Sequence, residues 1–125
     1  MLKTINVTFL TTYCSLIFWL SSKSVLPTPM LFTHQDKLHH LGAYFIMGVL
    51  AWRFFSDYLQ KPWLVFMLSL CFCSLYGISD ELHQSYVPNR EADILDWIAD
   101  TLGALIALIT IHLTKEKFKF ERQAS

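Results

Sequence analysis

The chain has 125 residues, of which 54% are hydrophobic and only 16% are charged, and its formal net charge at pH 7 is zero. Soluble domains contain about 25% charged residues and do not gather their apolar residues into long blocks. The balanced charge excludes a strongly basic protein, so we expect no nucleic-acid partner. The composition instead predicts an integral membrane protein in contact with the lipid bilayer, where about 20 apolar residues cross the hydrocarbon core.

Four apolar blocks follow one another along the chain, and each predicts one transmembrane helix. We place these helices at about residues 4–22, 37–56, 62–82 and 93–114. A short basic tail follows at 115–125. Serine, proline and turn residues separate the blocks. The sequence therefore predicts an all-α fold, a single membrane domain built as a bundle of four helices.

The first block could also be a cleaved signal peptide, because it has one lysine early and ends in a serine-rich stretch. The block is long for the apolar core of a signal peptide, and Lys23 stands where small residues should precede a cleavage site. We therefore expect the block to remain as a membrane helix.

The basic residues predict the orientation of the helices. Seven of the ten lysines and arginines lie at the two termini or in the loop between the second and third helices. The positive-inside rule places these segments, and so both termini, in the cytoplasm. Seven of the ten acidic residues gather at the opposite, outer end: Asp36, Asp80, Glu81, Glu91, Asp93, Asp96 and Asp100.

Three of the predicted helices carry polar or small residues every three or four positions, so each set lies on one face. Lipid cannot satisfy polar groups, and we expect these faces to meet inside the bundle. Helix by helix, the sets are Asp36, His40 and Tyr44; Ser69, Cys73, Tyr76, Asp80 and Gln84; and Asp93, Asp96, Asp100, Gly103, Ala107 and Thr110. The first helix is expected to offer only hydroxyls, at Thr4, Thr8, Thr11 and Thr12.

Several of these carboxylates have an explanation that requires no ligand. Thr33 and Asp36 have the spacing of a capping box before the second helix, and Asp93 and Asp96 resemble a capping box before the fourth. Both N-termini would lie at the outer end, where the helix dipole favours carboxylates. The deeper residues could likewise form a purely structural polar network.

Chemistry at the outer end is the alternative. General acid–base catalysis requires a titratable pair in one pocket, and Asp80 or Asp96 with His40 would provide one, although no nucleophile is evident. His39, His40 and His83 could bind a divalent ion together with the carboxylates. Because neither HExxH nor CxxC spacing occurs, we expect no metal site and no cofactor.

Two motifs occur in order between residues 36 and 112. The first begins D-K-x-x-H and contains Asp36, Lys37, His40 and Tyr44. The second has the pattern E-x-x-Q, then R, D and G, and contains Glu81, Gln84, Arg90, Asp96 and Gly103. Together they resemble the VanZ-like family of small bacterial membrane proteins. The chain departs from the family pattern at three positions: Leu41 replaces an aromatic residue, Asn89 a glycine and Asp100 an asparagine.

The resemblance implies a multi-pass protein of the bacterial cytoplasmic (inner) membrane, with its polar cluster on the extracytoplasmic side. The family is associated with low-level resistance to the lipoglycopeptide teicoplanin, and the resemblance supplies no reaction. We expect the cluster to bind a lipid or glycan head group, or a lipophilic glycopeptide, of the cell envelope. The candidate catalytic residues are Asp36, His40, Glu81 and Asp96. The candidate substrate-binding residues are Lys37, Tyr44, Asp80, Gln84, Arg90 and Asp100.

Two other functions fit the same residues. The first is a membrane enzyme, an acid–base hydrolase or transferase acting on a lipid-linked envelope substrate. The second is a proton- or ion-coupled transporter that uses Asp100 and His40 within the membrane. Four short helices are few for transport, so this function would require a homodimer.

Overall fold

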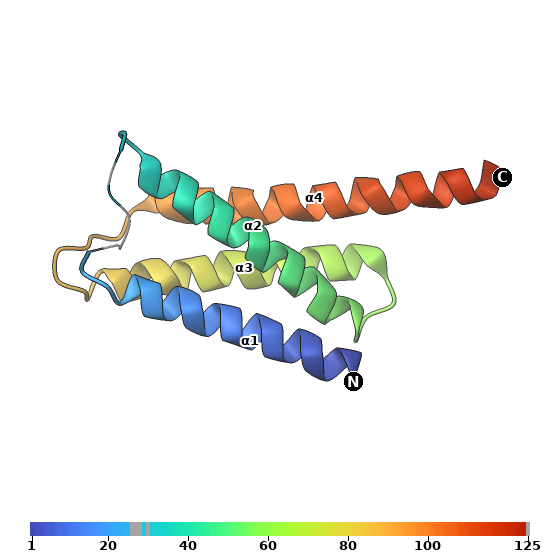
Figure 1. Cartoon of the computed structure of the whole chain (residues 1–125), viewed down its shortest axis with the longest axis horizontal. Coiled ribbons are helices and arrows are strands. Elements are labelled where there is room, and N and C mark those ends of the chain that lie inside the picture. The colour runs from blue at the N-terminus through green and yellow to red at the C-terminus, as the bar shows by residue number, and fades with distance from the viewer. Residues whose placement is uncertain (26–28, 30, 125) are drawn as a thin grey trace.

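The computed structural model describes residues 1–25, 29 and 31–124, with side chains as far as residue 116. Across these residues the chain forms four helices and no strand, which confirms the all-α prediction (Figure 1). The helices are α1 (Leu2–Ser21), α2 (Gln35–Ser56), α3 (Pro62–Gln84) and α4 (Ile94–Ala124). The backbone of α4 continues well past residue 114 and includes most of the basic tail.

The starts of the helices follow local chemistry. Pro62 occupies the first turn of α3, where its missing N–H costs nothing. Asp93 caps α4, because its Oδ1 accepts a hydrogen bond of 2.8 Å from the backbone N–H of Leu95. The backbone N–H of Asp93 donates to Glu81 Oε2 at 2.8 Å, so the reciprocal bond from Asp96 that a capping box requires does not form.

The capping box predicted before α2 is wrong. The residue that precedes α2 is His34, with φ 66° in the left-handed region, and its side chain makes no capping hydrogen bond. Gln35 secures this turn instead. Its Oε1 accepts from the backbone N–H of Leu31 at 2.7 Å, and its Nε2 donates to the carbonyl of Pro29 at 3.0 Å.

Successive helices run in opposite directions, and α2 lies diagonally across the bundle in contact with each of the other three (Figure 1). The C-terminal ends of α1 and α3 therefore meet the N-terminal ends of α2 and α4 at one end of the molecule, on the left of Figure 1. We call this the polar end. The N-terminus and the last turns of α4 lie toward the opposite end.

Small residues bring α2 and α4 close together. A Cβ atom on Gly103 would lie only 2.2 Å from the backbone oxygen of Leu41, and one on Gly48 would lie 3.0 Å from the Cα atom of Ala104. Ala107 is fully buried beside Gly48. This close approach positions the α2 side chains of the polar end against those of α4.

Large apolar side chains cover much of the outside of the bundle, while its interior contains polar and small side chains beside apolar ones. Phe9, Trp19 and Leu75 are among the exposed apolar residues, and Ala51 and Ser69 are fully buried. Within the part of the chain that the structure describes, three helical segments are long and apolar enough to cross a membrane: Leu2–Ser21, Pro62–Gln84 and Ile94–Glu116. Such an apolar outer surface is typical of a protein that contacts lipid.

Candidate functional site

Lys37 joins three carboxylates at the mouth of the polar end, and we call these four residues the Lys37 cluster. Its Nζ lies 2.9 Å from Asp36 Oδ2, 2.5 Å from Asp93 Oδ2 and 2.7 Å from Asp96 Oδ1. The hydrogen bond from Lys37 holds the pKa of Asp93 below its usual value, and the Leu95 N–H adds to this effect. The ammonium group thus ties the start of α2 to the start of α4.

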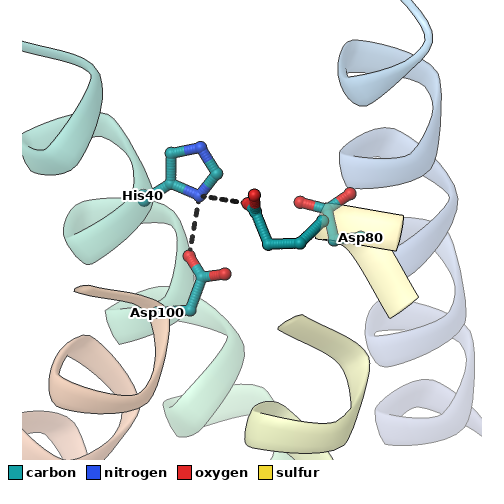
Figure 2. A group of neighbouring side chains, drawn as sticks. His40, Asp80 and Asp100 are labelled. Carbon is teal, nitrogen blue, oxygen red and sulfur yellow. Dashed lines mark hydrogen bonds and ion pairs between the residues drawn. The ribbon is translucent and has the colours of Figure 1, made fainter. Parts of the chain in front are cut away.

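One turn deeper, His40 lies among carboxylates from α3 and α4. Its Nδ1 is 2.9 Å from Asp100 Oδ1 and 3.9 Å from Glu81 Oε1. Its Nε2 is 3.7 Å from Asp96 Oδ2. Figure 2 shows the side chains of His40, Asp80 and Asp100 converging from three helices. We call His40, Asp80, Glu81 and Asp100 the His40 cluster.

The His40 cluster is withdrawn from solvent and only partly satisfied. The Asp100 side chain is fully buried and that of Glu81 is 9% exposed. Neither Asp100 Oδ2 nor Glu81 Oε1 has a hydrogen-bond partner among the described residues. A buried carboxylate oxygen without a partner is costly, so this arrangement is not explained by stability alone.

A second chain of hydrogen bonds connects the cluster to α1 and to the loop before α4. The hydroxyl of Ser21 donates to Asp80 Oδ1, and Gln84 Nε2 donates to Asp80 Oδ2 at 3.3 Å. The guanidinium of Arg90 donates to Gln84 Oε1 at 2.5 Å. The α3 residues Asp80 and Gln84 are therefore linked to α1 through Ser21 and to the loop before α4 through Arg90.

Among the hollows that the described residues form at the polar end, two are lined in part by the same side chains. The larger, of about 530 Å³, is lined by residues from α2, α3, the loop before α4 and the first turn of α4, among them Asp36, His40, Gln84, Arg90, Asp93 and Asp96. The smaller, of about 90 Å³, has apolar walls that include Ile17, Leu20, Ala43 and Tyr44. His40, Gln84 and Arg90 line both. A polar hollow thus adjoins a narrow apolar one.

All ten candidate site residues lie at the polar end, but they differ in what they face. Lys37 pairs with carboxylates and does not line either hollow. Tyr44 is buried in the wall of the smaller hollow, and its hydroxyl has no hydrogen-bond partner among the described residues. Of the histidines considered as metal ligands, only His40 joins the carboxylates. His83 packs against Phe18 with ring centroids 4.4 Å apart.

The expectation that helix one offers only hydroxyls is wrong. Buried Asn6 donates to Asp57 Oδ2 at 2.7 Å and accepts from Arg53 Nε at 3.1 Å, at the end opposite the polar end. Thr8, one of the predicted hydroxyls, instead donates to a carbonyl of its own helix. The contribution of Ser21 was also missed, because it stands in the serine-rich stretch that ends the first apolar block.

Comparison with known proteins gives the family context of this geometry. The family model described as VanZ/LLP1 matches residues 3–115. The chain belongs to this family. Neither a comparison with curated proteins nor one with solved structures found a match. Because the VanZ/LLP1 match extends from α1 into α4, the whole polar end lies within the part of the chain that defines the family.

Proposed function

We propose that all four helices of this VanZ/LLP1 protein cross the bacterial cytoplasmic membrane, with both termini in the cytoplasm and the polar end outside. At 22 residues, α2 is long enough to cross, and its contacts with the three other helices support a shared span. The basic residues Lys3, Arg53, Lys61 and Lys115 fall at the end where the termini lie.

We further propose that the polar end binds the head group of an envelope lipid or lipid-linked glycan. The observation that carries this proposal is the pair of hollows that share His40, Gln84 and Arg90. A polar space of about 530 Å³ is within the usual size of a ligand site. The apolar space beside it suits the first part of an acyl or prenyl chain, and a lipophilic glycopeptide has the same two-part character.

The charges of the larger hollow restrict the kind of head group. Asp36, Asp93 and Asp96 accept hydrogen bonds from hydroxyl or ammonium groups, whereas Arg90 donates to phosphate. A bare phosphate would meet more carboxylates than cations in the larger hollow. We therefore propose a head group that combines phosphate with hydroxyl or amino groups, as sugar phosphates and zwitterionic lipids do.

The test is the lipid that co-purifies with the protein from bacterial membranes, measured by mass spectrometry. Wild type is compared with Arg90→Ala and with Arg53→Ala, a matched arginine at the opposite end. We expect wild type and Arg53→Ala to retain a lipid class that Arg90→Ala loses at least about fivefold. Equal amounts in all three proteins would contradict head-group binding at Arg90.

A membrane enzyme is the second candidate, because His40 lies within reach of three carboxylates from α3 and α4. Such an arrangement can take up and return a proton during hydrolysis or transfer at a lipid-linked substrate. If it does so, Asp96→Asn and Glu81→Gln should insert and fold normally yet lose the cellular function of the protein. Full function in both variants would remove acid–base catalysis at these carboxylates.

A further inference from the structure

The His40 cluster contains the donors of a cation site. One ligand atom from each of its four residues lies within 4.8 Å of all the others. Four ligands arranged tetrahedrally around a divalent ion are about 3.4 Å apart, given bonds of roughly 2.1 Å. A contraction of at most about 1.4 Å between ligand atoms would therefore close the cluster around an ion. Three helices supply the ligands.

Unpartnered oxygen atoms provide a second, independent indication. Asp100 Oδ2 and Glu81 Oε1 both belong to side chains at least nine-tenths buried, and both lack hydrogen-bond partners among the described residues. Asp100 Oδ2 is directed to the side of α3 at Gly77, where an added Cβ would lie 2.9 Å away. Gly77 has no side chain, which lets Asp100 Oδ2 lie this close to α3.

The charge balance favours a cation at this place. The three carboxylates of the His40 cluster face one imidazole, which offers at most one positive charge. Of the cations at the polar end, Lys37 already pairs with Asp36, Asp93 and Asp96, and Arg90 donates to the amide of Gln84. Burying carboxylates without a compensating positive charge costs stability. A divalent ion would neutralise the negative charge that the imidazole does not balance.

We propose that His40, Glu81 and Asp100, with Asp80 as the fourth ligand, bind a divalent transition-metal ion, for which Zn²⁺ is the best match. Imidazole nitrogen together with carboxylate oxygen suits Zn²⁺ better than Ca²⁺ or Mg²⁺, which prefer oxygen ligands alone. Nδ1 of His40 would bind the ion, since it is the nitrogen that faces Asp100 and Glu81.

The surroundings of the ligands support this assignment. With Nδ1 bound to the ion, the Nε2–H of His40 would turn to Asp96 Oδ2, which is 3.7 Å away and would orient the ring. Asp80 accepts from Ser21 and Gln84, and an ionised carboxylate can do so while one lone pair binds a metal. The proposal concerns the ion alone and does not depend on head-group binding.

The test measures Zn²⁺ binding to the purified full chain in detergent at neutral pH, with any affinity tag removed, by calorimetry and elemental analysis. The variants are Asp100→Asn and Glu81→Gln, with Glu91→Gln as the matched control, since Glu91 is an exposed residue at the same end. Circular dichroism and size-exclusion elution confirm that each variant is folded.

We expect about one Zn²⁺ per chain in wild type and in Glu91→Gln, and binding at least about a hundredfold weaker in the two ligand variants. Asp96→Asn, which removes the group that orients His40, should weaken binding by about 10- to 100-fold. Excess Mg²⁺ should not displace Zn²⁺. Wild type that binds no stoichiometric Zn²⁺, or a folded Asp100→Asn that binds as wild type does, would overturn the proposal.

Discussion

The two ends of the bundle both contain buried polar groups, but they satisfy them differently. At the end where the N-terminus lies, the amide of Asn6 bridges the guanidinium of Arg53 and the carboxylate of Asp57, so one cation matches one anion. At the polar end, three carboxylates surround His40, and two buried oxygens have no partner among the described residues. Among the described residues, the first network leaves no buried side-chain oxygen or nitrogen without a partner, whereas the second does.

This difference separates a structural network from a candidate site. A fully satisfied network such as that of Asn6 holds helices in register and leaves nothing over for a ligand. The excess carboxylates around Asp100 reduce the stability of the bundle unless something else binds them. Sites where local stability is sacrificed in this way are typically sites of function.

The largest effect is expected where the polar end is forced apart. In Gly103→Ala the new Cβ would meet the backbone oxygen of Leu41 at 2.2 Å, so α2 must move away from α4. We expect a loss of about 4 kcal/mol in unfolding free energy, because backbone cannot yield as a side chain can. Gly42→Ala is the control: nothing lies within 4 Å of its Cβ. Equal stability of the two variants in detergent would contradict this packing.

Removing the imidazole should have the next largest effect. In metal-free buffer, His40→Leu leaves Asp100 buried without its partner and is expected to cost about 3 kcal/mol. The double variant His40→Leu/Asp100→Leu removes both charges and should recover much of this loss. Chemical denaturation of the single and double variants gives the comparison. If the double variant is as unstable as the sum of its parts, His40 and Asp100 are not coupled.

A substitution in the polar network at the opposite end of the bundle should cost less stability. Asn6→Ala removes the bridge between Arg53 and Asp57, but Arg53 is exposed and Asp57 half-buried, so both reach water. We expect a cost of about 1 kcal/mol, the usual value of a lost hydrogen bond. The measurement is the midpoint of chemical denaturation of Asn6→Ala, compared with that of His40→Leu. A larger loss of stability in Asn6→Ala than in His40→Leu would contradict the proposed difference between the two ends.

The sequence predicts the helices and the general place of the site, because both depend on local periodicity. Apolar blocks divided by prolines and serines define the helices, and carboxylates repeated every three or four residues must face inward in lipid. The convergence of Asp36, His40, Asp80 and Asp100 at one end follows from the antiparallel order of the helices alone.

The individual partners depend on the rotation and tilt of each helix, which periodicity does not determine. Ser21 stands in the serine-rich stretch that ends the first apolar block, and its spacing does not reveal that its hydroxyl donates to Asp80. Thr33 and Asp36 have the spacing of a capping box, but the left-handed conformation of His34 and the side chain of Gln35 form that turn. Only the assembled bundle shows which carboxylate oxygens have no hydrogen-bond partner among the described residues.

The smallest effect is expected from Asp36→Asn at the mouth of the polar end. The Asp36 side chain is 38% exposed, so its ion pair with Lys37 contributes less than about 0.5 kcal/mol. The hydrogen bond from Lys37 lowers the pKa of Asp36 below its usual value. The pair therefore stabilises the fold fully above the unfolded pKa of about 4, and this contribution is lost as the pH falls through the lower folded pKa.

The difference in Tm between wild type and Asp36→Asn should accordingly shrink as the pH is lowered from about 7 to about 3. Lys37 keeps two further carboxylate partners in this variant, so the Lys37 cluster should persist. A difference that stays constant down to about pH 3 would mean that the charge of Asp36 is not what matters. In that case the mouth of the polar end would resemble the Asn6 network, where geometry and hydrogen bonding rather than excess charge hold the helices together.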